Sequence, residues 1–320
     1  MAMETETVLD RRRLRRRLTL WRILALVAGL IAFGLIALPA GDGTGWTEGR
    51  HIARVSIEGL ITEDRAQLRL LHKIAKSKQV AGVILFINSP GGTTSGGEAL
   101  FDAIRELAKA KPVVAQFGTI ATSAAYIAGL ATDQIVARGN TITGSVGVIF
   151  QWAEVSQLLD KLGVKMNEIK SGPLKANPSP FQPLDDAGKA VAEEMVAESK
   201  RWFVGLVASR RGIDTTAISG LEQGRVFSGR EALANRLVDR IGGEAEAIKY
   251  LEEQRGVPKD LSIIDWKPRR ESDWSIIRVL TGAVARAVGA GGLGGLFDAE
   301  QALGRLRLDG LVSVWQGSER

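Results

Sequence analysis

The chain has 320 residues, a formal net charge of +6 and no cysteine. Its length and its 45% hydrophobic content fit one large folded domain or two small ones. The lack of cysteine excludes disulfides, thiol catalysis and cysteine-ligated metals, and two histidines are too few for a histidine-rich metal site. The first 22 residues carry seven arginines against three acidic residues, so most of the positive charge lies there. The rest is nearly neutral, which argues against a nucleic-acid partner.

An uncharged apolar segment follows the basic N-terminus. Residues 23–41 are long enough to cross about 30 Å of hydrocarbon as a helix. A signal peptide has a shorter apolar region and small residues at its cleavage site, a pattern that Ala37–Ala40 fits poorly. The sequence therefore predicts an uncleaved transmembrane anchor, with a cleaved signal peptide or a buried soluble helix as alternatives. Because arginines precede the segment, we expect a single-pass inner-membrane protein with a cytoplasmic N-terminus and its main domain on the periplasmic or extracytoplasmic side.

Strand and helix patterns alternate between residues 51 and 256. In chain order we expect a strand at 51–61, a helix at 63–78, a strand at 82–92, a helix at 96–110, a strand at 111–118, a helix at 121–131, strands at 134–139 and 144–150, helices at 154–162 and 186–210, and a turn plus helix at 225–243. Strands that alternate with helices favour parallel β-α-β units.

Two clusters of small residues are candidates for a catalytic site. Gly91 and Gly92 follow Asn88-Ser89-Pro90 at the end of a predicted buried strand, where open α/β sheets bind ligands. Adjacent glycines leave backbone N–H groups unobstructed, as an oxyanion hole requires, although a tight structural turn would look the same. Ser123 begins a predicted helix, so its Oγ and the N–H of Ala124 would lie at a helix N-terminus. A plain helix start is the alternative.

Lys175 lies between two prolines with no acidic residue nearby. A lysine acts as a general base only when it is neutral, and burial can lower the pKa of a lysine by several units. A surface loop lysine is the alternative, and Lys165 and Lys170 are competing candidates.

Five motifs in a fixed order resemble the signal peptide peptidase A family of Ser/Lys proteases. They are NSPGG, ATSAAYIAG, ITGSVGVI, SGPLKANPSPF and GRVFSGREAL. The likeness covers residues 50–256 in a single copy, as in the short form of the family. It implies an α/β fold of the ClpP/crotonase type with repeated β-β-α units, preceded here by one transmembrane helix. It also implies a serine endopeptidase that needs no metal or cofactor and degrades remnant signal peptides and other membrane-associated polypeptides.

The resemblance assigns a role to five residues of this sequence. It implies that Ser123 is the nucleophile, Lys175 the general base, Gly92 and the backbone of Ala124 the oxyanion donors, and Ser145 the serine that orients the lysine amine. The family often has two glycines after the nucleophile, whereas alanines stand at 124 and 125 here. A backbone donor survives that change, while the methyl groups would narrow the cleft.

The sequence predicts that the chain is divided into five parts. They are a basic N-terminus at 1–22, an anchor at 23–41, a linker at 42–50, a protease domain at 51–256, and a C-terminal extension at 257–320 that is expected to be helical and to face a membrane or a partner. Expected partners are peptide substrates, membrane lipid around the anchor, and further copies of the chain in a tetramer or octamer. In such an assembly, each site would combine Ser123 of one chain with Lys175 of its neighbour.

Two other functions fit the same fold. A crotonase-like acyl-CoA enzyme would share the oxyanion hole but would need a catalytic carboxylate in the cleft. A catalytically silent membrane scaffold would use the fold for assembly alone.

Overall fold

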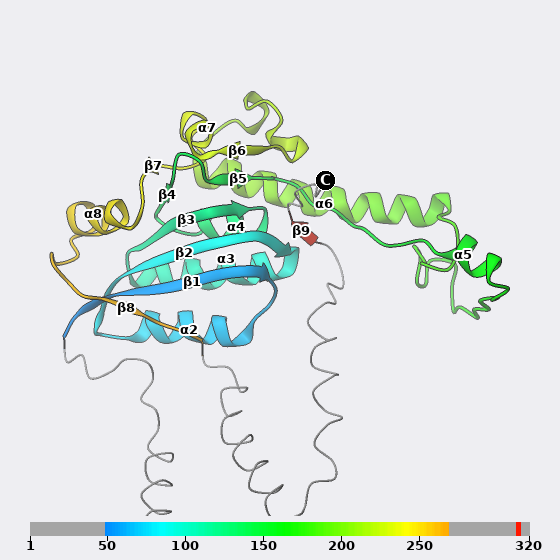
Figure 1. Ribbon diagram of the computed structural model, residues 1–320, viewed down its shortest axis with the longest axis horizontal. Helices are drawn as coiled ribbons and strands as arrows, with labels where there is room; N and C mark the ends of the chain where they lie inside the picture. Colours follow the sequence, from blue (N-terminus) through cyan, green and yellow to red (C-terminus); the bar gives the residue numbers. More distant parts are fainter. Residues whose placement is uncertain (1–48, 269–311, 315–320) are drawn as a thin grey trace, which may run out of the picture. The chain divides into compact units, whose positions relative to one another are not determined.

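The computed structural model describes residues 49–268 and 312–314 (Figure 1). The predicted anchor at 23–41 and most of the predicted C-terminal extension lie outside the described residues. Among the helices of the described part, none is both long and apolar enough to cross a membrane. The described chain is an α/β fold around one mixed sheet.

Within the described residues the sheet has nine strands, of which β6 and β9 pair antiparallel to their neighbours and the others pair parallel. The strands are β1 (His51–Ile61), β2 (Val80–Thr93), β3 (Val113–Thr122), β4 (Gln134–Ala137), β5 (Ile142–Gly144), β6 (Val226–Ser228), β7 (Arg240–Ile241), β8 (Ile263–Asp265) and β9 (Val312–Val314). The main order is β6-β5-β3-β2-β1-β8; β4 pairs with β3 and β7, and β9 pairs with β2.

Helices cover both faces of the sheet. They are α2 (Arg65–Lys76), α3 (Thr94–Ala110), α4 (Ala124–Leu130), α5 (Ser156–Lys161), α6 (Asp186–Arg211), α7 (Gly229–Ala234) and α8 (Glu244–Arg255), with 3-10 turns at Thr215–Ala217 and Leu221–Gln223. Val55 of β1 belongs to the large core shared with α2, α3 and α4, whereas Ile52 belongs to a smaller core with α8. The apolar run of β2 is continuous because its first half is buried on both faces.

The predicted elements up to residue 143 are confirmed within a few residues, and several later features differ, among them β6, β7 and α8, which were not expected. The strand expected at 144–150 is absent beyond Gly144, because Gly144 and Ser145 adopt φ values of 86° and 52° that turn the chain out of the ladder. β8 was not expected, yet it extends the sheet beside β1. Val257 and Trp266 are buried, so the packed core continues past residue 256.

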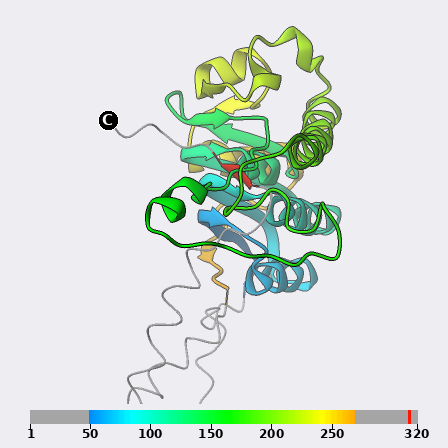
Figure 2. The same cartoon turned by 90° about the vertical axis from the view of Figure 1, so that its right-hand side faces the viewer.

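Residues 154–185, called the arm below, contain α5 and the Pro-rich loop that precedes α6. Figure 1 shows the α5 region standing away from the sheet at the N-terminal end of α6, and Figure 2, turned by 90°, shows the same green region in front of the sheet. Within the described residues, every hydrogen bond and ion pair of the arm has its partner between residues 154 and 189. Among the described residues, these polar contacts therefore link the arm to the rest of the chain only at the start of α6.

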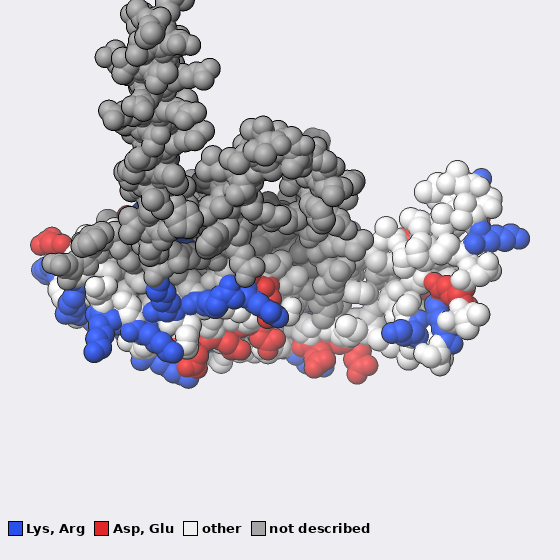
Figure 3. All heavy atoms as spheres, turned by 90° about the horizontal axis from the view of Figure 1, so that it is seen from below, with Lys and Arg blue, Asp and Glu red and all other residues white. Residues whose placement is uncertain are grey.

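The described surface carries both signs of charge. On the coloured part of the face in Figure 3, a group of Lys and Arg spheres at the left lies beside groups of Asp and Glu spheres below the centre. Arg54 contributes one such ion-pair network, since its guanidinium contacts Asp265 at 2.5 Å and Glu244 at 2.7 Å. This network joins β1 to β8 and to the start of α8.

Candidate active site

Ser123 lies in a strained turn between β3 and α4. Its backbone has a φ of 59° and a ψ of −121°, and only 1% of the residue is exposed. A non-glycine residue rarely adopts this conformation, which costs about 1–3 kcal/mol and is concentrated at functional sites. The side chain makes no capping bond to the helix that follows. The sequence predicted a serine at a helix start, and the structure adds a turn that holds the serine in an unfavourable conformation.

The strain at Ser123 predicts an unusual order of stability for two variants that both lack the hydroxyl. Ser123→Gly should be more stable than Ser123→Ala by about 1 kcal/mol, because glycine adopts a positive φ without a Cβ penalty. At an ordinary position inside a helix, the alanine variant is instead the more stable one, by about 0.5–1 kcal/mol. Chemical denaturation of the two purified variants measures the difference, and Gly205→Ala on the exposed face of α6 is a control for the ordinary order. A Gly variant less stable than the Ala variant would contradict a strained turn.

The turn is held against β5. The Ser123 N–H donates to the Gly144 carbonyl at 2.9 Å, and Thr122 is paired with Gly144 in the ladder between β3 and β5. Ser145 follows directly, and its own N–H donates to the Arg225 carbonyl at 3.0 Å. The structure therefore places Ser123 and Ser145 on adjacent strand ends, as two members of the predicted site require.

The glycine pair at the end of β2 lies between two strands. Gly92 pairs with Ile61 of β1 on one side and with Ser313 of β9 on the other. A Cβ at Gly92 would lie only 1.8 Å from the Ile61 carbonyl oxygen, so the close approach of β1 by itself demands glycine there. Gly91 has a φ of 114°, which also favours glycine. Packing thus accounts for the residue type, and any oxyanion role would belong to the backbone.

β9 brings the chain's own C-terminal region to this edge. Val312–Val314 pairs antiparallel with Gly91–Thr93. An added strand of this kind uses main-chain hydrogen bonds, so it places few demands on sequence. The sequence predicted a helical C-terminal extension and missed this strand, although the alternation of apolar and polar residues in Val312-Ser313-Val314 is a weak strand signal.

Lys175 is not brought to Ser123 within one chain. Lys175 lies in the arm and is exposed, and its backbone N–H donates to the Gly172 carbonyl at 3.1 Å. Its amine makes no hydrogen bond or ion pair with the rest of the described chain. The competing Lys170 differs, because its amine pairs with Glu168 at 2.6 Å. Among the described residues, Lys175 thus differs from Lys170 in having no ion-pair partner.

Neither histidine replaces the lysine as a base near Ser123. His51 is fully buried and its Nε2 accepts a hydrogen bond from Trp266 Nε1 at 3.1 Å, at the start of β1. His72 is exposed on α2. The Ser123 N–H donates to the Gly144 carbonyl, and the Ser123 carbonyl accepts from the Ile127 N–H. Neither histidine is therefore placed to serve a His-based triad at Ser123.

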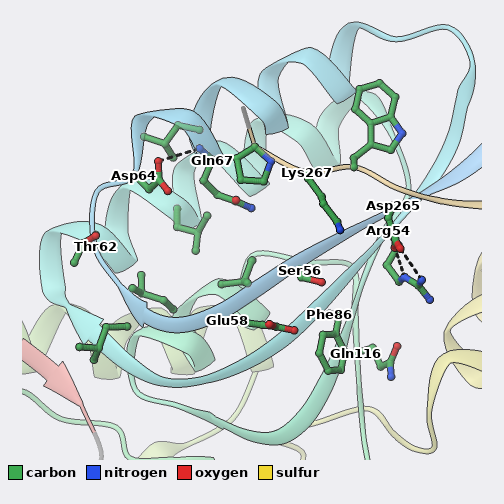
Figure 4. Close-up of a pocket in the computed structure, with 18 of the residues that line it drawn as sticks. Arg54, Ser56, Glu58, Thr62, Asp64, Gln67, Phe86, Gln116, Asp265 and Lys267 are labelled. Atoms are coloured by element: carbon green, nitrogen blue, oxygen red, sulfur yellow. Dashed lines mark hydrogen bonds and ion pairs between the residues drawn. The ribbon is translucent and has the colours of Figure 1, made fainter. Parts of the chain in front are cut away.

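A separate hollow of about 1030 Å³ lies along β1 (Figure 4). Figure 4 shows Ser56 and Glu58 of β1, Gln67 of α2 and Lys267 around it. None of the five predicted site residues lines this hollow. The candidate nucleophile and this hollow therefore occupy different places, and Ser123 lies instead at the edge between the ends of β2 and β3.

The sequence matches known proteins over most of the described fold. The profile of Peptidase family S49 matches residues 105–258, and that of Clp protease matches residues 53–140. A Synechocystis protein named as a protease is 32% identical over 235 residues, which are 73% of this chain and 83% of the relative. An Enterococcus faecium protein named as a signal peptide peptidase is 34% identical over 235 residues, which are 68% of this chain and 67% of the relative.

A third relative, a Methanocaldococcus jannaschii protein named as a protease, is 36% identical over 193 residues. That match spans 60% of this chain and 62% of the relative's length. The class that the Clp-protease-like fold and these relatives define is the serine proteases. The chain belongs to Peptidase family S49. The resemblance to signal peptide peptidase A that the sequence indicated is confirmed.

Proposed function

We propose that this chain is a membrane-anchored endopeptidase that cleaves peptides with Ser123 as nucleophile and Lys175 of a neighbouring copy as general base. The observation that carries the proposal is the buried, strained Ser123 beside a sheet edge that already accepts an antiparallel strand. Strain of this kind persists only where the surrounding structure holds it, and it concentrates at reactive positions. The remaining members of the site follow from how a peptide would lie on that edge.

β9 indicates how a substrate would bind. An extended peptide in place of Val312–Val314 would pair with Gly91–Thr93 and pass the end of β3, where Ser123 lies. Its main chain would supply the hydrogen bonds, and its side chains would alternate between the two sides of the sheet edge. This mode suits unfolded segments such as released signal peptides, which we propose as the substrates because a relative is named as a signal peptide peptidase.

The reaction needs a proton acceptor and stabilisation of an oxyanion. Ser123 Oγ attacks the peptide carbonyl while the neutral amine of Lys175 takes the hydroxyl proton. The carbonyl oxygen becomes an oxyanion that the backbone N–H groups of Gly92 and Ala124 stabilise. The tetrahedral intermediate collapses to an acyl-enzyme as the lysine gives its proton to the leaving amine. Water, deprotonated by the same lysine, then hydrolyses the ester.

The arm supports a site shared between chains. Of the thirteen large apolar side chains that are exposed among the described residues, eight lie in the arm. They are Leu158, Leu162, Val164, Met166, Ile169, Leu174, Phe181 and Leu184. Clustered exposed apolar groups mark a surface for a protein partner. A second copy is the partner that we propose, because contact there would bury the arm and bring its lysine to a neighbour's Ser123.

The anchor at 23–41 completes the proposal. It would hold the protease domain at the membrane, on the periplasmic or extracytoplasmic side, where cleaved signal peptides remain in the bilayer. Basic residues before the anchor set this orientation. Protease added to intact spheroplasts would then digest the catalytic domain before lysis.

Ser145 is proposed to orient the lysine amine. Ser145→Ala should lower kcat by about tenfold, the value of one hydrogen bond to a charged or reacting group, and leave KM nearly unchanged. The expected effect is far smaller than that of Ser123→Ala, because Ser145 exchanges no proton with the substrate. Steady-state kinetics on a fluorogenic peptide measure both constants. A variant with the wild-type kcat would remove Ser145 from the site.

β9 and a substrate cannot occupy the same edge at once. A chain that ends at residue 311 lacks β9, and its KM for peptides should fall by about tenfold because a tethered competitor is gone. A chain that ends at residue 316 keeps β9 and is the matched control. Equal KM values for the two chains would show that substrates bind elsewhere.

The direct test of the proposed function is digestion of defined peptides, with cleavage positions mapped by mass spectrometry. The full-length wild type should cut extended apolar peptides, and the folded Ser123→Ala variant should leave them intact. Cutting by both proteins would assign the activity to another residue or to a contaminant. No cutting by either, with peptides of signal-peptide composition, would favour a silent scaffold.

A further inference from the structure

Near the ends of β2 and β3, the regular backbone pairing between the two strands stops, and side-chain hydrogen bonds connect them instead. The ladder is regular up to Ile87 paired with Phe117, shifts, and makes its last pair at Ser89 and Ala121. The extra residues of β3 are accommodated by Asn88, whose Oδ1 accepts from the Thr119 N–H at 3.1 Å and the Ile120 N–H at 3.2 Å. The two strands then separate to form the edge on which β9 lies.

One hydroxyl bridges the strands beyond that last pair. Thr122 Oγ1 donates to the Pro90 carbonyl at 3.0 Å, and Thr122 is fully buried. Thr122 directly precedes Ser123, and Pro90 directly precedes the Gly91-Gly92 pair. The strained turn is thus fixed to β5 by the Ser123 N–H and to β2 by the Thr122 hydroxyl.

We propose that Thr122 is a positioning residue, which sets the distance between Ser123 and the backbone N–H groups of the glycine pair. The inference rests on the proposed function, in which those N–H groups stabilise the oxyanion. Such donors act only within a narrow range of distances from the oxyanion, so a small shift of one strand against the other lowers the rate. Thr122 touches neither substrate nor reacting atoms and acts through the separation of the two strands.

A threonine that only stabilises the fold should affect stability but not the rate of catalysis. Thr132 is the natural control, since it is also buried and its Oγ1 donates to the Gly129 carbonyl at 2.7 Å and the Gln134 carbonyl at 3.0 Å, between α4 and β4. Both Thr122→Val and Thr132→Val remove a buried hydroxyl that donates to a backbone carbonyl. They should lower the melting temperature similarly, and only a positioning role separates them in kinetics.

The experiment compares Thr122→Val, Thr122→Ser and Thr132→Val in the full-length chain. Thr122→Val should lower kcat by about 10- to 100-fold with KM changed less than about twofold, because binding along the edge is unaffected. The inhibition constant of a peptide aldehyde, whose adduct with Ser123 places an oxygen in the oxyanion site, should rise by a similar factor. Thr122→Ser restores the hydroxyl and should stay within about threefold of wild type, as should Thr132→Val.

The outcomes separate this inference from the function on which it rests. Wild-type kcat and aldehyde inhibition in Thr122→Val, together with an inactive Ser123→Ala, would overturn the positioning role alone. Activity retained in Ser123→Ala would overturn the proposed function instead. A kcat loss in Thr122→Ser equal to that in Thr122→Val would also refute the role, because the hydroxyl is present. If Thr122→Val does not fold, Thr122→Ala removes the hydroxyl without a branched replacement and is judged by the same criteria.

Discussion

Ser123→Ala should reduce peptide cleavage by at least about 10⁴-fold, to the background of the assay, while the protein remains folded. The size of the loss follows from the mechanism, because no other group can form the acyl-enzyme. The alanine adopts the same backbone conformation with one atom fewer, so the melting temperature should change by only a few degrees. Cleavage of a fluorogenic peptide and thermal unfolding measure the two effects.

A remote serine supplies the control for this loss. Ser209 lies on α6, where its Oγ donates to the Leu206 carbonyl at 3.0 Å. Ser209→Ala should cleave peptides at the wild-type rate. Activity in Ser123→Ala within tenfold of wild type would mean that another residue is the nucleophile.

Lys175→Ala should also abolish cleavage, and mixing it with Ser123→Ala should restore activity. Each protein alone lacks one half of every site. If each site takes its serine and its lysine from two neighbouring chains, a random one-to-one mixture holds both wild-type residues in about one quarter of its sites. The expected activity of coexpressed, doubly tagged oligomers is therefore about one quarter of wild type.

The matched control for this experiment is Lys165→Ala, which removes another arm lysine and should leave cleavage unchanged. Mixed oligomers that remain as inactive as either parent would place the base within the same chain as Ser123. Full activity of Lys175→Ala by itself would remove this lysine from the mechanism.

The sequence predicted the elements that depend on local pattern. The alternation in His51–Ile61 and the helical spacing of Leu100, Ile104 and Leu107 correspond to β1 and α3. β8 was missed because it is three residues long and its position is set by a partner, β1, more than two hundred residues earlier. The strand expected after Gly144 failed because two positive φ values in succession override the apolar pattern of the residues that follow.

In the candidate site, too, local pattern predicts some features and misses those that depend on contacts between distant segments. Ser123, Ala124 and Gly92 lie at strand and helix ends that local pattern identifies, and Ser145 follows a strand paired with β3. The bridge from Thr122 to Pro90 and the pairing of β9 with Gly91–Thr93 are contacts between distant segments, which no local signal reports. The groups that Lys175 would contact during the reaction cannot be predicted from local pattern either, because the proposed partner is a separate chain.

Covalent labelling of Ser123 tests the central claim most directly. The full-length chain is treated with a fluorophosphonate, digested, and searched by mass spectrometry for the modified residue, with heat-unfolded protein as the control. The account predicts one adduct per chain, on the peptide that contains Ser123, with cleavage lost in proportion to labelling and no adduct on the unfolded protein. An adduct on a different serine that tracks the loss of activity, or full loss of activity with Ser123 unmodified, would contradict it.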